Sequence, residues 1–460
     1  MSSTLIDTSK SGVGNVPALG PEHRVAWPKR TVRTLANGMQ VVLAESHSVP
    51  KMVAELFFRS GNAVTAATAP GLAEITAAVV RTGTVNRDSR AIEEGLRSMG
   101  ADLGTSAGAD TSAISIAGLA ESAEGLLGMV EELARRAAFP ADEFERVRRM
   151  KIEDLRVERS TPGFIAAERL RHMLFGTHPY AIVAPSEAQV ASYRREQLQE
   201  YYGGYYVPAD ALFVAVGDFD SAAMLDLIEK TFGAWNATAA TKPANPAPPE
   251  LRGRRVHFVH VPGSVQTEVL VGNRAITRLH PDWTRLALAN SIYGGAFNSR
   301  LVMNIREQKG YTYSPRSGIS ALREYGYFTV HAAVRNDVVA ATLAEIFYEM
   351  DRMRALPVGE DELANAQNYL TGTFSLGVAT QDGMMGQLST VYLNRLPEDY
   401  LENYRERIRS LKTGDVLMAA RRYFDSTNAQ IVVVGDGEQV GEQAALFGAV
   451  QQYDAQGNQV

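Results

Sequence analysis

The histidines of this chain decide whether it can hold a catalytic metal. The 460-residue sequence has eight histidines and no cysteine, which excludes disulfides, thiolate metal sites and cysteine nucleophiles. No two histidines stand four residues apart, the spacing that places two imidazoles on one helical face. His257 and His260 are three apart in the strand-like VHFVHV, which would direct them to opposite faces. Since a catalytic zinc needs three protein ligands, we expect no metal site in this chain. The full set is His23, His47, His172, His178, His257, His260, His280 and His331.

Other patterns that could carry chemistry favour structural roles. The sequence has no G-x-S-x-G elbow and no glycine-rich phosphate loop after a strand. Asp218 and Asp220 follow a strand-like run that ends in VGD, and we expect them to cap the next helix rather than bind a divalent ion. Trp235 and Trp283 are expected to be core or linker aromatics.

Composition limits the class of protein. At 460 residues the chain is too long for a single ordinary core, and 45% hydrophobic with 21% charged residues is typical of a folded protein in water. The net charge is -6 with no block of basic residues, so nucleic acid is not an expected partner. The apolar runs are too short to span a membrane. The first 30 residues lack a signal-peptide pattern, which predicts a cytoplasmic protein, or a periplasmic one if a signal was removed.

The same series of landmarks occurs twice, about 218 residues apart. ALFVAVGD ends at Asp218 and IVVVGD ends at Asp436, and an aromatic pair precedes each run at the same offset. A segment rich in Pro, Ala and Asn lies between the two copies and is typical of a linker. The predicted units are a flexible lead (1–30), a first domain (31–235), a linker (236–253), a second domain (254–450) and a polar tail (451–460).

Within the first half, strand and helix patterns alternate. Asn37-Gly38 between two strand-like segments predicts a hairpin, and Val53–Arg59 predicts a third strand. Helical periodicity follows over 71–80 and 91–99, and long amphipathic helices follow the strand TSAISIAGL. We therefore expect an α+β fold of two tandem homologous layers, each an antiparallel sheet with segregated helices.

The order of these motifs resembles the pitrilysin/insulinase family of inverted-motif zinc peptidases, the clade that includes mitochondrial processing peptidase. The resemblance rests on FFRSGNA, GLAEITAAVVRTGT, HPYAIVAPSEAQV and YYVPADALFVAVGD, and it covers residues 30 to 450. It implies a metallopeptidase-like clamshell half. It also implies that the turn His178-Pro179-Tyr180 is a packing feature.

The resemblance implies a zinc motif that this chain lacks. In the family, one helix carries H-x-x-E-H, in which two histidines bind zinc and the glutamate activates water. The matching positions here are Glu74, Ala77 and Ala78. The third family ligand, a glutamate, falls on Asp154, which we interpret as a solvated helix residue. This zinc motif is degenerate, and no metal is expected in the chain.

The second half keeps a different part of the family's machinery. The segment GGAFNSRLVMNIREQKGYTYSPRSG (294–318) matches the context in which the family presents an Arg and a Tyr seven residues apart, here Arg306 and Tyr313. A guanidinium and a phenol opposite a metal can bind the carbonyl oxygen that becomes negative during peptide hydrolysis. The structural alternative is that Arg306 is an exposed base at the end of a helix and that Tyr313 is a half-buried aromatic residue of a strand.

Neighbouring residues leave some assignments open. Tyr311 is an alternative to Tyr313, on the same face of the expected strand, and Arg316 is a candidate second cation. Gly294-Gly295 is expected to end a helix in a tight turn. Phe297, Arg300 and Leu301 would orient the helix that follows.

The preferred hypothesis is a non-catalytic subunit of a heterodimeric zinc peptidase. Its partner would carry H-x-x-E-H and the zinc, and the substrate would be an unfolded peptide bound in an extended form. A non-enzymatic scaffold or peptide-binding protein of the same fold is the alternative. A third hypothesis is an independent enzyme with a relocated site at Glu74, Glu153 or Asp154, acids for which the sequence shows no base or metal partner.

Overall fold

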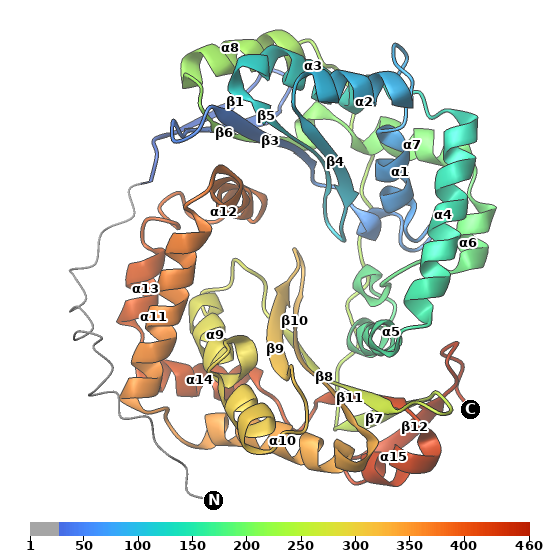
Figure 1. Cartoon of the computed structure of the whole chain (residues 1–460), viewed down its shortest axis with the longest axis vertical. Coiled ribbons are helices and arrows are strands. Elements are labelled where there is room, and N and C mark those ends of the chain that lie inside the picture. The colour runs from blue at the N-terminus through green and yellow to red at the C-terminus, as the bar shows by residue number, and fades with distance from the viewer. Residues whose placement is uncertain (1–26) are drawn as a thin grey trace, which may run out of the picture.

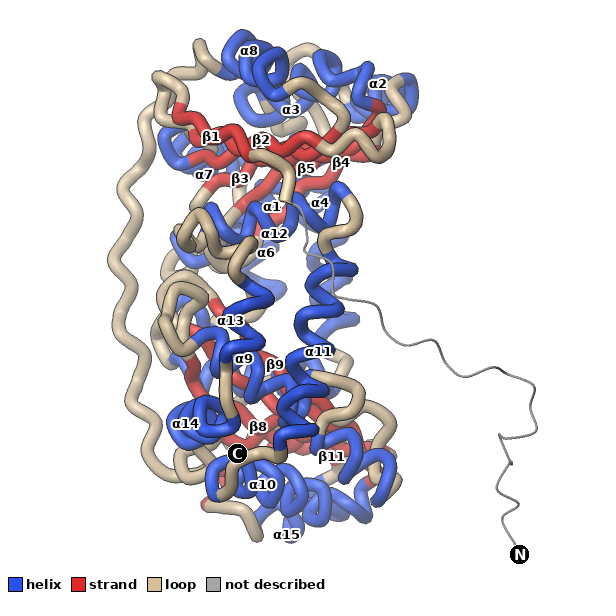
Figure 2. Tube along the Cα trace, turned by 90° about the vertical axis from the view of Figure 1, so that its left-hand side faces the viewer, coloured by secondary structure: helices blue, strands red, loops and turns tan. Residues whose placement is uncertain are grey.

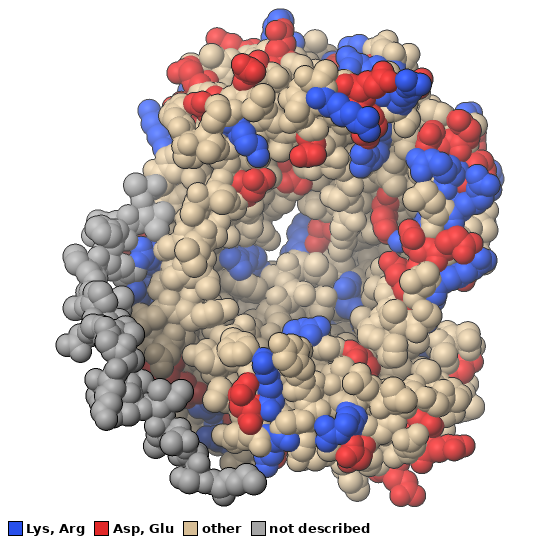
Figure 3. Space-filling model, viewed as in Figure 1, with Lys and Arg blue, Asp and Glu red and all other residues tan. Residues whose placement is uncertain are grey.

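The computed structural model describes residues 27–460, so most of the expected N-terminal lead (1–30), and His23 with it, lies outside the described residues. Two sheets stand at opposite ends of the molecule, and long helices connect them along both sides (Figure 1). Between the sheets, the space-filling view shows a hollow (Figure 3).

The first sheet has six strands in the order β1-β2-β6-β3-β5-β4. The strands are β1 (Arg30–Thr34), β2 (Gln40–Glu45), β3 (Lys51–Phe58), β4 (Asp102–Ala107), β5 (Ser112–Leu119) and β6 (Ala211–Gly217). The helices of this half are α1 (Leu72–Val80), α2 (Ser89–Ser98), α3 (Ala123–Arg136), α4 (Ala141–Arg159), α5 (Pro162–Phe175), α6 (Glu187–Ser192), α7 (Arg195–Tyr205) and α8 (Ser221–Phe232).

The second sheet has six strands in the order β12-β7-β11-β8-β10-β9. The strands are β7 (Arg255–His260), β8 (Gln266–Ala275), β9 (Arg316–Ala321), β10 (Gly326–Arg335), β11 (Gln430–Gly435) and β12 (Ala449–Tyr453). The helices are α9 (Trp283–Asn290), α10 (Val339–Ala355), α11 (Glu360–Gly377), α12 (Gln381–Leu393), α13 (Tyr404–Ser410), α14 (Thr413–Tyr423) and α15 (Gly437–Ala445). Two π-helical segments, η6 (Ser291–Gly295) and η7 (Val302–Gln308), follow α9. Single 3-10 turns are η2 (Asn62–Val64), η3 (Ala120–Ser122), η4 (Pro179–Ala181), η5 (Pro208–Asp210) and η8 (Asn336–Val338).

The α+β fold class is confirmed, with one difference inside the sheets. Both sheets are mixed, because β2 pairs with β6 in parallel and β7 pairs with β11 and β12 in parallel, whereas the remaining pairs are antiparallel. The expectation of purely antiparallel sheets missed these pairs, which join strands far apart in the sequence. The hairpin between β1 and β2 is present, with Gly38 at φ 91°.

The expected polar tail (451–460) begins inside the last strand of the second sheet. Gln451 to Tyr453 belong to β12, and the guanidinium of Arg169 lies 3.8 Å from the centre of the Tyr453 ring. Beyond the strand, Asp454 accepts backbone hydrogen bonds from Gln456 (3.0 Å) and Asn458 (2.8 Å). Parallel pairing with β7 and this cation–π contact anchor the end of the chain. Residues 236–253 contain no helix or strand and run along one side of the molecule between the halves (Figure 2).

Each sheet packs its own helices on one face and receives a helix from the other half on the opposite face. Helix α5 of the first half lies on β8 and β11 of the second sheet, where Leu170 and Leu174 are buried. Helix α12 of the second half lies on β6 and β3 of the first sheet, where Leu388 and Val391 are buried. The exchange is visible in Figure 1, where α12 lies beneath the first sheet and α5 above the second. It buries apolar faces that neither half could cover alone.

None of the helices within residues 27–460 is both long enough and apolar enough to cross a membrane.

Truncating the buried Leu388 side chain of α12 should lower the stability of the whole chain. Leu388 is fully buried against the first sheet, so Leu388→Ala should lower the free energy of unfolding by about 2 to 5 kcal/mol. The matched control is Leu376→Ala, a leucine of the adjacent helix that is 76% exposed and should change stability by less than about 0.5 kcal/mol. Urea unfolding followed by circular dichroism makes the comparison, and equal effects of the two variants would contradict the exchange as a stabilising contact.

A partly buried carboxyl on the α12-covered face should make stability depend on pH. Glu55 of β3 shares this face with Val53 and Phe57, and burial raises its pKa to about 7. The unfolded chain loses this proton near pH 4.3, so stability should fall as pH rises from about 4.5 to 7 and stay lower above it. Glu55→Gln should therefore be about 2 kcal/mol more stable than the native chain at pH 8, and the gain should disappear near pH 4.5. Urea titrations at both pH values test this, with exposed Glu442→Gln as control; a gain independent of pH would refute it.

Candidate functional site

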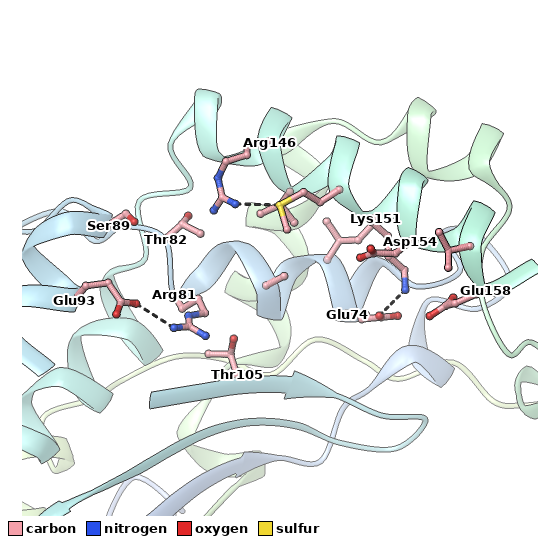
Figure 4. Close-up of a pocket in the computed structure, with 15 residues that line it drawn as sticks. Glu74, Arg81, Thr82, Ser89, Glu93, Thr105, Arg146, Lys151, Asp154 and Glu158 are labelled. Atoms are coloured by element: carbon pink, nitrogen blue, oxygen red, sulfur yellow. Dashed lines mark hydrogen bonds and ion pairs between the residues drawn. The ribbon is translucent and has the colours of Figure 1, made fainter. Parts of the chain in front are cut away.

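Three of the four degenerate zinc positions line a cavity of about 700 Å³ between α1, α4 and the edge strand β4 (Figure 4). Glu74 and Ala78 of α1 and Asp154 of α4 face it, whereas Ala77 is buried in the core. Lys151 of α4 reaches across to Glu74, with 2.7 Å between Nζ and Oε1. The Lys151 side chain is only 13% exposed, so its ammonium is held by this carboxylate. The carboxylate at the position of the family's first zinc ligand is thus paired with a cation of the protein itself.

The donor set of this cavity does not fit zinc. Ala77 and Ala78 have no ligand atoms, and Glu74 is committed to Lys151. No histidine is among the residues that line the cavity. Over residues 27–460, no group of three or more His, Asp or Glu side chains is arranged to hold one metal ion. Glu153, an acid of the relocated-site hypothesis, pairs with Arg156 at 2.6 Å on the exposed side of α4.

The histidines singled out in the sequence have structural contacts. His257 is buried between Gln430 and Tyr453, and its pKa is lowered to about 4, first by burial. His260 lies on the other face of β7 and accepts the backbone N–H of Gly437 at 2.9 Å. The buried His178 accepts the N–H of Tyr180 at 3.1 Å.

The remaining sequence-predicted structural residues also have clear contacts. Asp220 caps α8 as expected, by accepting the N–H of Ala223 at 2.9 Å. The same expectation was wrong for Asp218, which pairs with His47 at 2.6 Å instead. Trp235 and Trp283 are buried.

Arg306 and Tyr313 meet in the structure. The Arg306 guanidinium lies 4.3 Å from the centre of the Tyr313 ring and 4.9 Å from that of Phe297. Both rings are mostly exposed, Tyr313 at 77% and Phe297 at 67%. Arg306 Nε also lies 3.1 Å from Glu307. The Arg306 side chain is 24% exposed, and the three side chains form a stack at the surface, called the Phe297–Arg306–Tyr313 stack below.

Tyr313 does not sit on a strand, which corrects the sequence expectation. It lies in the loop before β9, and β9 begins only at Arg316, directly after Pro315. Proline has no N–H to donate to a sheet, so it delays the start of the strand. Tyr311 packs partly buried against the second core. The loop therefore exposes Tyr313 and not Tyr311.

Buried polar contacts hold the backbone beneath this stack. Arg300 forms a two-pronged pair with Glu362 of α11, at 2.7 and 2.8 Å. The Asn304 amide on η7 donates to Glu345 and Glu349 of α10, both at 2.9 Å. At the end of η6, a Cβ on Gly294 would come within 2.7 Å of Leu301, so only glycine allows this close approach. Arg306 consequently projects from a segment tied to two long helices.

Two side chains important to these sites were not identified from the sequence. Lys151 lies 77 residues from Glu74, and no local pattern signals their pairing. Phe297 was expected only to orient a helix, although an aromatic residue beside a basic helix is a general signal for cation–π stacking. Arg316, the candidate second cation, lies at the start of β9 and lines a different cavity.

Comparison with known proteins relates the chain to a family of peptidases. Residues 192–370 match the family description "Peptidase M16 inactive domain". Residues 192–370 of the chain form an M16 peptidase inactive domain. Its fold matches the crystal structure of a peptidase M16 inactive domain from Pseudomonas fluorescens with a TM-score of 0.83 and 26% identity, covering 89% of this chain and 98% of that one. The resemblance to the pitrilysin/insulinase peptidases is thereby confirmed.

Proteins of lower sequence identity are similar to this chain over most of its length. A protease from Helicobacter pylori shares the fold with a TM-score of 0.82 at 19% identity, covering 89% of this chain and all (100%) of that one. YmxG of Bacillus subtilis (strain 168), named an uncharacterized zinc protease, is 21% identical over 400 residues, which are 84% of this chain and 96% of the relative.

A rebuilt set of zinc ligands should bind zinc more tightly when Lys151 is removed. The variant Glu74→His/Ala78→His/Asp154→Glu supplies the three family ligands but leaves an unpaired ammonium beside them. Repulsion between that ammonium and Zn²⁺ should weaken binding at least about tenfold relative to the same variant with Lys151→Ala. Zinc titration of the two folded variants with a competing chelator measures the ratio. Equal affinities would show that the Lys151 ammonium does not weaken zinc binding.

Proposed function

We propose that this M16-type chain is the non-catalytic subunit of a heterodimeric zinc peptidase. In this proposal its partner carries H-x-x-E-H and the zinc, and this chain supplies Arg306 and Tyr313 to the partner's site. The substrate is an unfolded peptide held between the two subunits. The chain binds no catalytic zinc of its own.

The observation that carries the proposal is the contrast between the two halves. In the first half the zinc positions are an acid paired with Lys151 and two alanines. In the second half, the Arg306 guanidinium stacks on the Tyr313 ring, and the rings of Tyr313 and Phe297 are both exposed. A chain that kept only the fold would have no need of a guanidinium stacked on two exposed aromatic rings.

The chemistry suited to this pair is stabilisation of an oxyanion. Attack of a metal-bound water on a peptide carbonyl places negative charge on its oxygen, and N–H and phenolic O–H donors can bind that charge. Arg306 Nε faces Glu307, which leaves the terminal nitrogens to donate. The partner's zinc would supply the Lewis acid, and this chain's residues would bind and orient the carbonyl.

Extended peptide binding is supported by the edges of the two sheets. β4 and β9 each have a single strand neighbour, and each borders a cavity. An unpaired edge can accept a peptide as an added strand through main-chain hydrogen bonds.

We also propose that the two halves arose by internal duplication and form separate domains at 31–235 and 254–450. Five adjacent strands of each sheet have the same spatial order relative to their order in the chain. These strands are β2-β6-β3-β5-β4 in the first sheet and β7-β11-β8-β10-β9 in the second. The exchanged helices α5 and α12 occupy corresponding positions, which supports the same origin.

Complementation tests the proposal. The purified chain alone should hydrolyse nothing, and addition of its H-x-x-E-H-bearing partner should produce hydrolysis of a quenched-fluorescent unfolded peptide. Arg306→Ala should lower kcat/KM of the complex by at least about a hundredfold and Tyr313→Phe by about tenfold, because each removes a donor to the oxyanion.

Tyr348→Phe serves as the matched control, since Tyr348 is also an exposed tyrosine of the second half and should leave the rate unchanged. Stoichiometric zinc with hydrolysis by the chain alone would overturn the proposal. An Arg306/Tyr313 double variant with full activity in the complex would instead favour the scaffold or peptide-binding alternative.

A further inference from the structure

A second cavity, of about 490 Å³, lies on the face of the second sheet that α5 partly covers. Helix α5 packs mainly on β8 and β11, and its residues Gly163, Ala167 and Leu170 form one wall. The floor is made by β8, β9 and β10, so residues of both halves of the chain line this cavity.

Strand alternation directs a row of β9 side chains into this cavity. Ser317 and Ile319 face the second core, where Ser317 Oγ donates to Asn290 at 2.7 Å. Arg316, Gly318 and Ser320 therefore face the cavity. No atom lies within 4 Å of the position that a Cβ on Gly318 would take, so the space above the edge strand is open.

Arg316 brings an uncommitted positive charge to this space. Among the described residues, its guanidinium has no hydrogen-bond, ion-pair or aromatic partner. The other arginine of the cavity, Arg171, is committed: it donates to the Tyr180 carbonyl at 2.6 Å and to the Tyr327 hydroxyl at 3.2 Å. The two cations thus differ, with Arg171 structural and Arg316 available.

The acid of the cavity does not neutralise Arg316. Glu268 is almost fully buried and forms a hydrogen bond with His331, on the neighbouring strand β10. Two guanidinium groups therefore face one carboxylate, and that carboxylate already has a partner. The field in the open part of the cavity favours an added anion.

We propose that this cavity is a subsite for a carboxylate of a bound peptide, with Arg316 as its ligand. The carboxylate is either an Asp or Glu side chain or a free carboxyl terminus, and the planar guanidinium can bind it with two parallel hydrogen bonds. Ser320 and Thr329 line the same cavity and add hydroxyl donors. The inference deepens the proposed function, since it assigns an acidic preference to the peptide that the complex would hold.

Fluorescence anisotropy of labelled extended peptides with the purified full-length chain tests the subsite without any partner. Three probes of one sequence are compared: internal Glu with an amidated terminus, internal Gln with an amidated terminus, and internal Gln with a free terminus. We expect at least one carboxylate probe to bind about tenfold tighter than the Gln amide, and the probe that does so identifies the source of the carboxylate.

Arg316→Ala should remove this preference, and Arg316→Lys should retain part of it because the charge remains without the planar fork. Arg97→Ala is the matched control, since Arg97 is an exposed arginine of α2 that lines neither cavity. Equal binding of all three probes, or an undiminished preference in Arg316→Ala, would overturn the subsite. Because Arg306 lies outside this cavity, a failure of the complementation experiment with the probe preference intact would refute the heterodimer proposal alone.

Discussion

The structure depends on a mutual exchange in which each half packs one of its helices on the sheet of the other half. Strands β6 and β11 are buried along their whole length, so both faces of each sheet must be covered. One face packs against helices of its own half, and the other receives α12 or α5 from the opposite half. Without the exchange, two large apolar surfaces would face water. The two contacts also set the separation of the sheets, and with it the hollow between them.

Both candidate sites are attached to the elements that make this exchange. α4, which carries Lys151 and Asp154, leads directly into α5, and α5 walls the cavity of Arg316. On the other side, Glu362 of α11 holds Arg300, and α11 leads directly into α12. The packing that joins the halves therefore also positions the side chains proposed to act on a peptide.

Local pattern predicted the elements well and their partners less well. The third strand was expected at Val53–Arg59 and found at Lys51–Phe58, because alternation is a property of neighbouring residues. The parallel pairing of β2 with β6 joins segments more than a hundred residues apart and has no local signature. Tyr313 was expected on a strand, but Pro315 shifts the strand start and leaves the tyrosine in a loop.

The sequence by itself determined which chemistry this protein can supply. The absence of a histidine pair and the presence of Arg306 and Tyr313 in their motif depend only on residue identity and spacing. The tertiary structure decided how those residues are engaged: Lys151 pairs with Glu74, Phe297 and Tyr313 enclose Arg306, and Arg316 stands free in a cavity. These contacts arise from the packing of helices and sheet edges that are distant in the chain, and such packing is set by the burial of whole faces rather than by any local pattern.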